Sequence, residues 1–194
     1  MKRGFKSWCE KVAEHVRKDL DLQPGAPLDP WVLARHSDIR VWAADEIPNL
    51  DQKVLRTVLV EDKNSWSAAT LNVGSTDLVI LNSSHSRARQ TSSLMHEIAH
   101  LLLGHNPARV DVSEDGFLLL QSYNKEQEEE ADWLGGTLLL PRIALVWIRG
   151  QDMDLAQAAT LYGASRDLLR WRLDKTGVNL QFHRRAQMRR ASIN

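Results

Sequence analysis

The residues best suited to chemistry are His96, Glu97 and His100, which form an H-E-x-x-H motif inside an apolar stretch. On a helix, side chains four residues apart project from the same face, so both imidazoles can reach one zinc ion. Glu97 directly follows the first histidine, where its carboxylate can take a proton from water at that metal. The motif therefore predicts a zinc site with a general base beside it.

The residues around the motif predict that its helix is buried. Leucine, isoleucine, methionine and alanine occupy nearly every face of a helix spanning about residues 89–103. Three ionisable side chains on a buried helix are costly unless they are paired or bind a metal. A chance match on a solvated surface helix is therefore the weaker interpretation.

An acidic run at residues 126–132 offers the third protein ligand that such a site needs. Taken alone, a run of carboxylates more often forms a solvated helix face. A helix turns by about 100° per residue, which places Glu128 at the edge of the apolar stripe containing Ala131. Glu128 is therefore the carboxylate best placed to face the two histidines.

The expected ligands of Zn²⁺ are therefore His96, His100 and Glu128. Asp132 lies one helical turn after Glu128 on the same side, so it could accept a hydrogen bond from a ligating imidazole. Glu130 is the alternative third ligand.

Two further side chains near the motif need an interpretation. Tyr123, five residues before Glu128, is a candidate donor to the oxyanion of a tetrahedral intermediate, although a buried core tyrosine fits equally well. His105 lies beyond Gly104 and about 180° from His96 on a helical wheel. We therefore expect His105 to be a surface residue.

Composition sets broad limits on the kind of protein. The chain has 194 residues, enough for one domain with a core, and carries 25 basic and 25 acidic residues. Zero net charge gives no argument for nucleic acid as the main partner. A single cysteine excludes an intrachain disulfide and a cysteine metal site. The N-terminus has no apolar leader and no 18-residue apolar stretch occurs, so we expect a cytoplasmic protein without membrane contact.

Periodicity predicts a mostly helical α+β fold. An amphipathic first helix is indicated by Phe5, Trp8, Val12, Val16 and Leu20. Two short apolar runs separated by an Asn/Gly/Ser turn predict a β-hairpin. Residues 57–60 would suit either a helix or a strand. The expected elements are a helix at 30–36, a strand at 39–43, a helix from 51, hairpin strands at 66–71 and 77–82, and helices at 89–103, 125–140, 153–162 and 165–175.

We divide the chain into a domain at 1–150 and a helical appendage at 151–194 with a basic tail. The appendage resembles a helix-turn-helix in which Ser165 caps the second helix. That helix could offer its basic side chains to DNA phosphates. We favour a helical hairpin packed on the first domain, because the appendage is not strongly basic. The basic side chains in question are Arg166, Arg170, Arg172 and Lys175.

Taken together, three segments resemble the ImmA/IrrE metallopeptidases. These are the H-E-x-x-H motif, the run Glu128-Glu129-Glu130-Ala131-Asp132, and Leu138-Leu139-Leu140-Pro141. In that family H-E-x-x-H is followed by a segment like E-x-E-A-N-x-F-A-x-x-L-L-x-P. The chain departs from it at Asp132, where Asn is usual, and at Leu134-Gly135-Gly136, where Phe-Ala-Ala is usual. The resemblance covers roughly residues 5–175.

The resemblance implies a compact gluzincin-like metallopeptidase domain, with a small antiparallel sheet beside the active-site helix. A strand edge there would hold an extended peptide. Family members typically cleave a helix-turn-helix repressor, which relieves repression of stress or mobile-element genes. The resemblance thus implies a zinc endopeptidase whose partner is such a repressor.

Two other functions stay open. The chain could be a peptidase-like antirepressor that sequesters a regulator or toxin without cleavage. It could also be a DNA-binding regulator with a structural zinc. Glu97 favours the peptidase, since zinc binding alone needs no base, and a structural site usually has four protein ligands.

Overall fold

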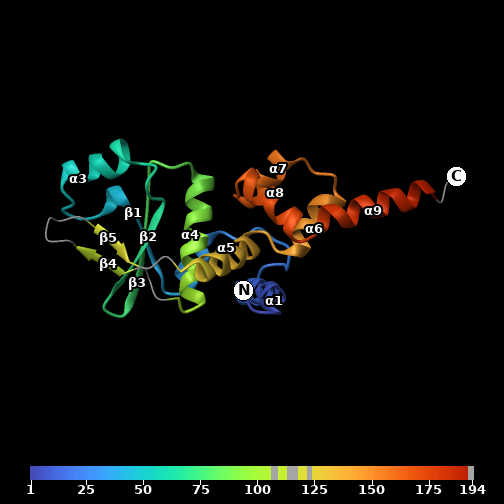
Figure 1. The fold of residues 1–194 in the computed structure, drawn as a ribbon, viewed down its shortest axis with the longest axis horizontal. Helices are drawn as coiled ribbons and strands as arrows, with labels where there is room; N and C mark the ends of the chain where they lie inside the picture. Colours follow the sequence, from blue (N-terminus) through green and yellow to red (C-terminus); the bar gives the residue numbers. More distant parts are fainter. Residues whose placement is uncertain (106–108, 113–117, 122–123, 192–194) are drawn as a thin grey trace.

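The computed structural model describes residues 1–105, 109–112, 118–121 and 124–191. The strands and α3 gather at one end, α4 and α5 occupy the middle, and α9 extends away from the body at the other end (Figure 1). The helices are α1 (Phe5–Asp19), α2 (Pro30–His36), η1 (Ala44–Glu46), α3 (Gln52–Arg56), η2 (Thr57–Glu61), α4 (Arg87–Leu102), α5 (Lys125–Leu139), α6 (Arg142–Gly150), α7 (Leu155–Tyr162), α8 (Arg166–Lys175) and α9 (Val178–Ala191). The strands are β1 (Arg40–Ala43), β2 (Ala68–Val73), β3 (Thr76–Leu81), β4 (Arg109–Val112) and β5 (Leu118–Gln121).

The main sheet is mixed and has the strand order β1-β3-β2. The expected hairpin is confirmed, since β2 and β3 pair antiparallel around Gly74, whose φ of 67° suits a glycine turn. The expected α+β fold is confirmed, but the small sheet is mixed and not antiparallel throughout, because β1 pairs parallel with β3. The segment from η1 to η2 connects β1 to β2, which lies at the far edge of the sheet. The hairpin then turns back, so that β3 lies between β1 and β2 and runs parallel to β1. Strands β4 and β5 form a separate antiparallel pair.

Helix α4 packs against β2 and β3 and also against α5. Its start is capped by Ser86, whose Oγ accepts a hydrogen bond from the Arg89 N–H at 3.4 Å. It ends at Leu102, and Gly104 follows with a φ of 64°, in the left-handed region. Helix α5 is capped by Asn124, whose Oδ1 accepts from two backbone N–H groups, and it ends before Pro141. Both predicted helices are therefore confirmed within one or two residues.

Gly135 brings α4 and α5 close together. A Cβ at this position would lie 3.1 Å from the Met95 carbonyl oxygen and 3.4 Å from the His96 Cα. Any side chain would therefore press on the backbone of α4. The same face of α5 carries Asp132 and Glu128, one and two turns earlier, so the close approach directs both carboxylates towards the motif.

Helix α1 buries a face displaced by one position from the expected one. Its fully buried residues are Cys9, Ala13 and Arg17, whereas Trp8 is 43% exposed. Small side chains at the first two positions let α1 approach α5 closely, and the larger apolar residues flank that contact. Burial raises the pKa of the Cys9 thiol to about 12, so the thiol stays protonated at neutral pH.

Helices α7 and α8 form the expected helical hairpin. Gly163 ends α7 with a φ of 61°, and the Ser165 Oγ caps α8 by accepting from the Leu168 N–H at 3.0 Å. Arg170 pairs with Asp167 at 3.0 Å on the exposed surface. These features agree with a packed hairpin whose arginines are paired or solvated.

Arg172 cannot serve as a DNA contact, so it is wrongly placed among the basic side chains that this helix could offer to phosphates. The residue is fully buried. Its guanidinium donates to the Leu140 carbonyl oxygen at 3.1 Å and to the Glu10 carboxylate at 2.9 Å. Arg172 therefore ties α8 to α1 and to the end of α5.

A single cluster of buried apolar side chains reaches from α1 to Val178 at the start of α9. The division of the chain at residue 150 stays a prediction.

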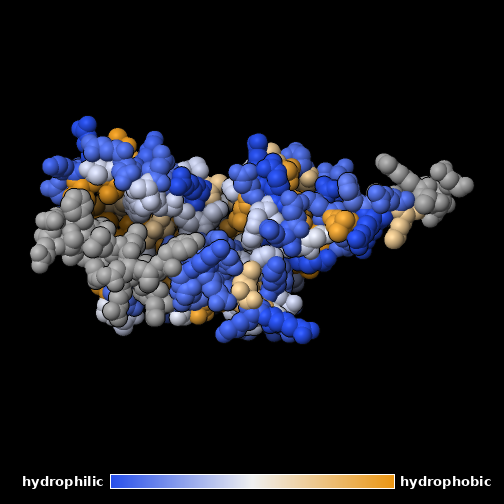
Figure 2. All heavy atoms as spheres, viewed as in Figure 1, coloured by the Kyte–Doolittle hydropathy of each residue, from blue (hydrophilic) through white to orange (hydrophobic). Residues whose placement is uncertain are grey.

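No single helix in the described ranges is both long and apolar enough to cross a membrane; α5 and α6 meet those criteria only together, across a 49° bend. The visible face is mainly hydrophilic, with apolar side chains in small separate groups (Figure 2).

Candidate metal centre

Three side chains that could donate lone pairs to a metal ion converge between α4 and α5. They belong to His96, His100 and Glu128, and we call them the donor group. His96 Nε2 lies 3.0 Å from His100 Nε2 and 3.2 Å from Glu128 Oε2, and His100 Nε2 lies 3.4 Å from Glu128 Oε1. One ligand atom from each residue falls within 4.8 Å of the others. In the part of the chain that the structure describes, this is the group of donors that could hold a metal ion.

The donor set suits one small divalent cation. Zinc binds histidine nitrogens and carboxylate oxygens at about 2.0–2.2 Å in tetrahedral sites. Donors arranged in this way lie roughly 3.4 Å from one another. The observed separations of 3.0–3.4 Å are close to that value, and three protein ligands leave a fourth position for water or substrate.

The protonation of the two histidines differs because their surroundings differ. Burial and the neighbouring His96 lower the pKa of His100 to about 4, so its imidazole is neutral at pH 7. Burial also acts to lower the pKa of His96. The hydrogen bond with Asp132 and the nearby carboxylates of Glu97 and Glu128 outweigh burial and raise that pKa overall. Protonation of His96 and binding of a cation at the site would compete, because both use the lone pair of the same ring.

Asp132 lies on the outer side of His96. Its Oδ1 is 3.0 Å from His96 Nδ1, while the other ring nitrogen faces the donor group. This is the position that the helical spacing from Glu128 predicts. The contact favours the proton on Nδ1, which leaves the lone pair of Nε2 directed into the site.

His105 is buried against His100, so the expectation of a surface residue is wrong. Its side chain is 8% exposed, and its Nδ1 lies 2.9 Å from His100 Nδ1. The helical wheel does not apply because the chain leaves the helix at Gly104. The Gly104 N–H donates to the Leu101 carbonyl oxygen at 3.1 Å, and the His105 N–H donates to that of His100 at 3.0 Å. This Schellman motif folds residue 105 back onto residue 100.

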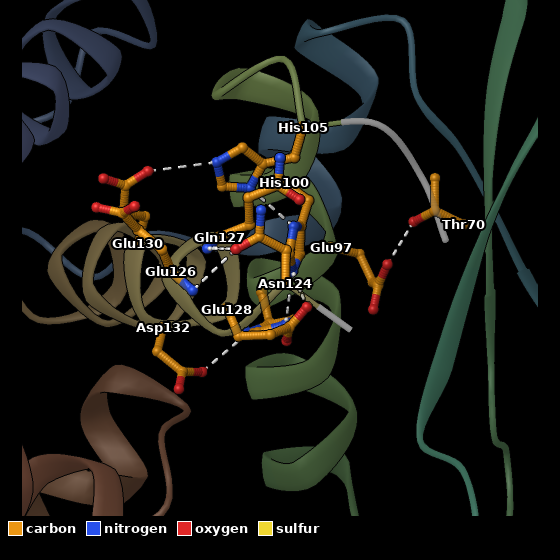
Figure 3. A network of polar contacts seen from close by, with 11 residues as sticks. Thr70, Glu97, His100, His105, Asn124, Glu126, Gln127, Glu128, Glu130 and Asp132 are labelled. Atoms are coloured by element: carbon orange, nitrogen blue, oxygen red, sulfur yellow. Dashed lines mark hydrogen bonds and ion pairs between the residues drawn. The ribbon is translucent and has the colours of Figure 1, made fainter. Parts of the chain in front are cut away.

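Glu130, the expected alternative ligand, lies outside the donor group. Its Oε2 is 3.6 Å from His105 Nε2, and its side chain is 16% exposed. Figure 3 shows Glu130 extending from α5 towards His105. The structure thus brings Glu128, and not Glu130, to the two histidines of the motif.

Glu97 points away from the histidines towards Thr70 on β2 (Figure 3). The Thr70 hydroxyl donates to Glu97 Oε2 at 2.5 Å. Burial raises the pKa of the Glu97 carboxyl above its ordinary value. Sequence reasoning did not single out Thr70, because nothing in its local pattern shows that β2 passes beside α4.

A cleft of about 360 Å³ opens between the start of β2, α4 and α5. Glu97 and His96 lie on its wall, so a bound molecule would meet the Glu97 carboxylate and one imidazole of the donor group together. The cleft is lined by Ser67, Ala68, Ser92, Ser93, His96, Glu97 and Asp132. Tyr123, the candidate oxyanion donor, lies outside the described residues.

Comparison with known families identifies the domain. The model of the IrrE N-terminal-like domain, a peptidase family, matches residues 53–174, more than half of the chain. The chain belongs to the IrrE N-terminal-like domain family. Every residue of the donor group lies inside the matched range, while α1, α2 and β1 precede it. No curated protein gives a significant match.

Membership of the IrrE-like family confirms the resemblance seen in the sequence over α4 and α5. The match begins at Lys53, later than the resemblance suggested. The segment before it still contributes to the IrrE-like domain here, because β1 pairs with β3 and α1 packs on α5.

Proposed function

We propose that the protein is a zinc-dependent endopeptidase of the cytoplasm that cleaves a helix-turn-helix repressor. One observation carries the proposal. His96, His100 and Glu128 direct three donor atoms to one point, while the buried carboxylate of Glu97 lines the adjoining cleft. A purely structural zinc site has no use for that carboxylate.

His96, His100 and Glu128 would hold the zinc ion through two neutral nitrogens and one carboxylate. When bound, zinc would supply Lewis-acid chemistry, which acidifies water and polarises a carbonyl group. Glu97 accepts the proton of the attacking water and returns it to the leaving amine. The raised pKa of Glu97 suits both steps, because it brings the carboxyl closer to neutrality.

The edge strand β2 supports a peptide as the substrate. Among the described residues, β2 pairs along one side, with β3, in the order β1-β3-β2. Its first residue lines the cleft with Glu97, and its Thr70 binds the Glu97 carboxylate. An extended segment could therefore add to the β2 edge and pass beside the base. The choice of a repressor rests on the resemblance to ImmA/IrrE peptidases.

The decisive experiment compares Glu97→Gln with wild type. Both purified proteins, loaded with zinc, are incubated with a helix-turn-helix repressor from the same genome, and products are identified by mass spectrometry. We expect Glu97→Gln to bind zinc normally and to cleave about 10²–10⁴-fold more slowly, because it cannot accept a proton. Glu129→Gln, an equivalent change at an exposed position of α5, is the control.

Each outcome has a distinct meaning. Cleavage by Glu97→Gln at the wild-type rate would rule out this role of the carboxylate. A zinc-loaded wild type that binds the repressor without cutting it would establish sequestration instead. A DNA-binding regulator receives less support, because Arg172 is buried and Arg170 is paired with Asp167.

A further inference from the structure

Both ring nitrogens of His100 have a defined neighbour. On one side, Nε2 faces His96 and Glu128 in the donor group. On the opposite side, Nδ1 lies 2.9 Å from His105 Nδ1. His105 therefore touches the far side of the imidazole and cannot share the metal with it.

The chemistry of a ligating imidazole decides how the two histidines share protons. If Nε2 of His100 offers its lone pair to a cation, the proton of the neutral ring must be on Nδ1. That N–H then donates to His105 Nδ1, which must be an unprotonated acceptor. The proton of His105 is consequently on its Nε2, and this N–H points towards Glu130.

Glu130 is suited to hold His105 in that tautomer. Its Oε2 lies 3.6 Å from His105 Nε2, a distance typical of electrostatic attraction and longer than a direct hydrogen bond. The side chains of His105 and Glu130 are 8% and 16% exposed, so water screens this attraction only weakly. Glu130 therefore contacts His105, and His105 contacts His100, which belongs to the donor group (Figure 3).

We propose that His105 and Glu130 are positioning residues that fix the tautomer and ring orientation of His100 for metal binding. The inference rests on the proposed zinc site and assigns a role to two residues beyond its ligands. The Schellman turn at Gly104 provides the backbone support, because it ties the His105 N–H to the His100 carbonyl oxygen.

The two metal-binding histidines would thus be oriented in different ways. His96 is oriented by Asp132, whose side chain is 66% exposed, and His100 by a buried imidazole. Loss of the acceptor at His105 would leave a buried N–H of His100 without a partner. Such a loss is unfavourable in a buried site and permits the other tautomer.

The experiment measures zinc affinity of the full-length chain by competition with a chromophoric chelator. His105→Phe keeps a ring but removes the acceptor, so we expect affinity to fall about 10–100-fold. His105→Asn places an amide oxygen near the Nδ1 position, so it should restore most of that affinity. Glu130→Leu should weaken binding, whereas Glu129→Leu, at the exposed neighbouring position, should not.

Cobalt-substituted protein gives a second readout. The visible spectrum of bound Co²⁺ should change for His105→Phe and stay unchanged for Glu129→Leu, because only the first alters ligand orientation. Circular dichroism of the metal-free variants checks folding. If His105→Phe does not fold, the comparison of Glu130→Leu with Glu129→Leu decides.

The possible results separate the two proposals. Tight zinc binding by wild type with unchanged affinity in His105→Phe and Glu130→Leu would overturn the positioning role and leave the peptidase proposal intact. A wild-type chain that does not bind zinc would overturn the zinc peptidase itself, and the positioning role with it.

Discussion

Helix α5 contributes to two polar clusters, one partly exposed and one buried, that differ in how their groups are satisfied. Near its N-terminus, Glu128 meets His96 and His100, and three donor atoms with lone pairs face one point. Near its C-terminus, the Arg17 guanidinium donates to the carbonyl oxygens of Ala13, Ala26 and Leu138. There Arg172 likewise donates to Leu140 and to Glu10.

The difference shows that buried charge alone does not identify a functional site. In the arginine cluster, N–H donors meet carbonyl and carboxylate acceptors, so most of the donors find partners within the protein and connect its helices; Arg172 Nη1 is the exception. In the histidine cluster, two imidazole nitrogens and a carboxylate face one point, where each of them offers a lone pair once it carries no proton. Such an arrangement is favourable when a cation occupies the centre.

The largest effect should come from removing a ligand. Glu128→Gln should lower zinc affinity on the order of a thousandfold, since loss of even an outer partner typically costs 10–100-fold. The metal-free variant should unfold within about 1 kcal/mol of wild type, because the contact is partly exposed and contributes little without the metal. Chelator competition and urea unfolding in EDTA measure the two quantities, with Glu129→Gln as the control.

The opposite result is expected in the arginine cluster. Arg172→Met should lower the free energy of unfolding by about 3 kcal/mol, because it leaves Leu140 and Glu10 without their buried donor. Arg170→Met, the same change at an exposed position, should cost less than about 1 kcal/mol. Zinc affinity of the folded protein should not change in either variant. A large fall in affinity for Arg172→Met would show that the two clusters are coupled.

The sequence predicted the elements whose signals are local. The helices predicted at 30–36, from 51, at 125–140 and at 165–175 and the hairpin around Gly74 appear where expected. In the structure, the caps at Asp29, Asp51 and Ser165 and the end of α5 before Pro141 all act within a few residues. The direction of β1 and the buried face of α1 depend on which distant elements they meet. Periodicity within one segment contains no information about that choice.

The same distinction applies to the site. Spacing within α4 and α5 places His96, His100, Glu128 and Asp132 together in the structure, because each pair lies on one helical face. His105 was misplaced because its position depends on the turn after the helix. A glycine at C′ tends to bring residue C″ against residue C3, so Gly104 is the sequence signal that could have located His105. The roles of His96, His100 and Glu128 as metal ligands stay predictions.

Two adjacent glycines of α5 allow the finest test of the comparison. A Cβ at Gly135 would meet the Met95 carbonyl oxygen at 3.1 Å, which is backbone at the histidine cluster. A Cβ at Gly136 would meet the Arg172 Cδ at 3.1 Å and the Trp171 ring at 3.2 Å, which are side chains of the arginine cluster. Backbone cannot rotate away, whereas side chains can adjust by a few tenths of an ångström.

Gly135→Ala should therefore shift α5 along α4, lower zinc affinity several-fold and reduce the free energy of unfolding by about 1–2 kcal/mol. Gly136→Ala should leave zinc affinity unchanged and alter stability by less than about 1 kcal/mol, because the helix propensity of alanine offsets the crowding. Chelator competition and urea unfolding measure both variants. If Gly135→Ala and Gly136→Ala lowered zinc affinity equally, the two clusters would not be separate. Each substitution would then displace the whole of α5, and not only its contact with α4 or with the arginine cluster.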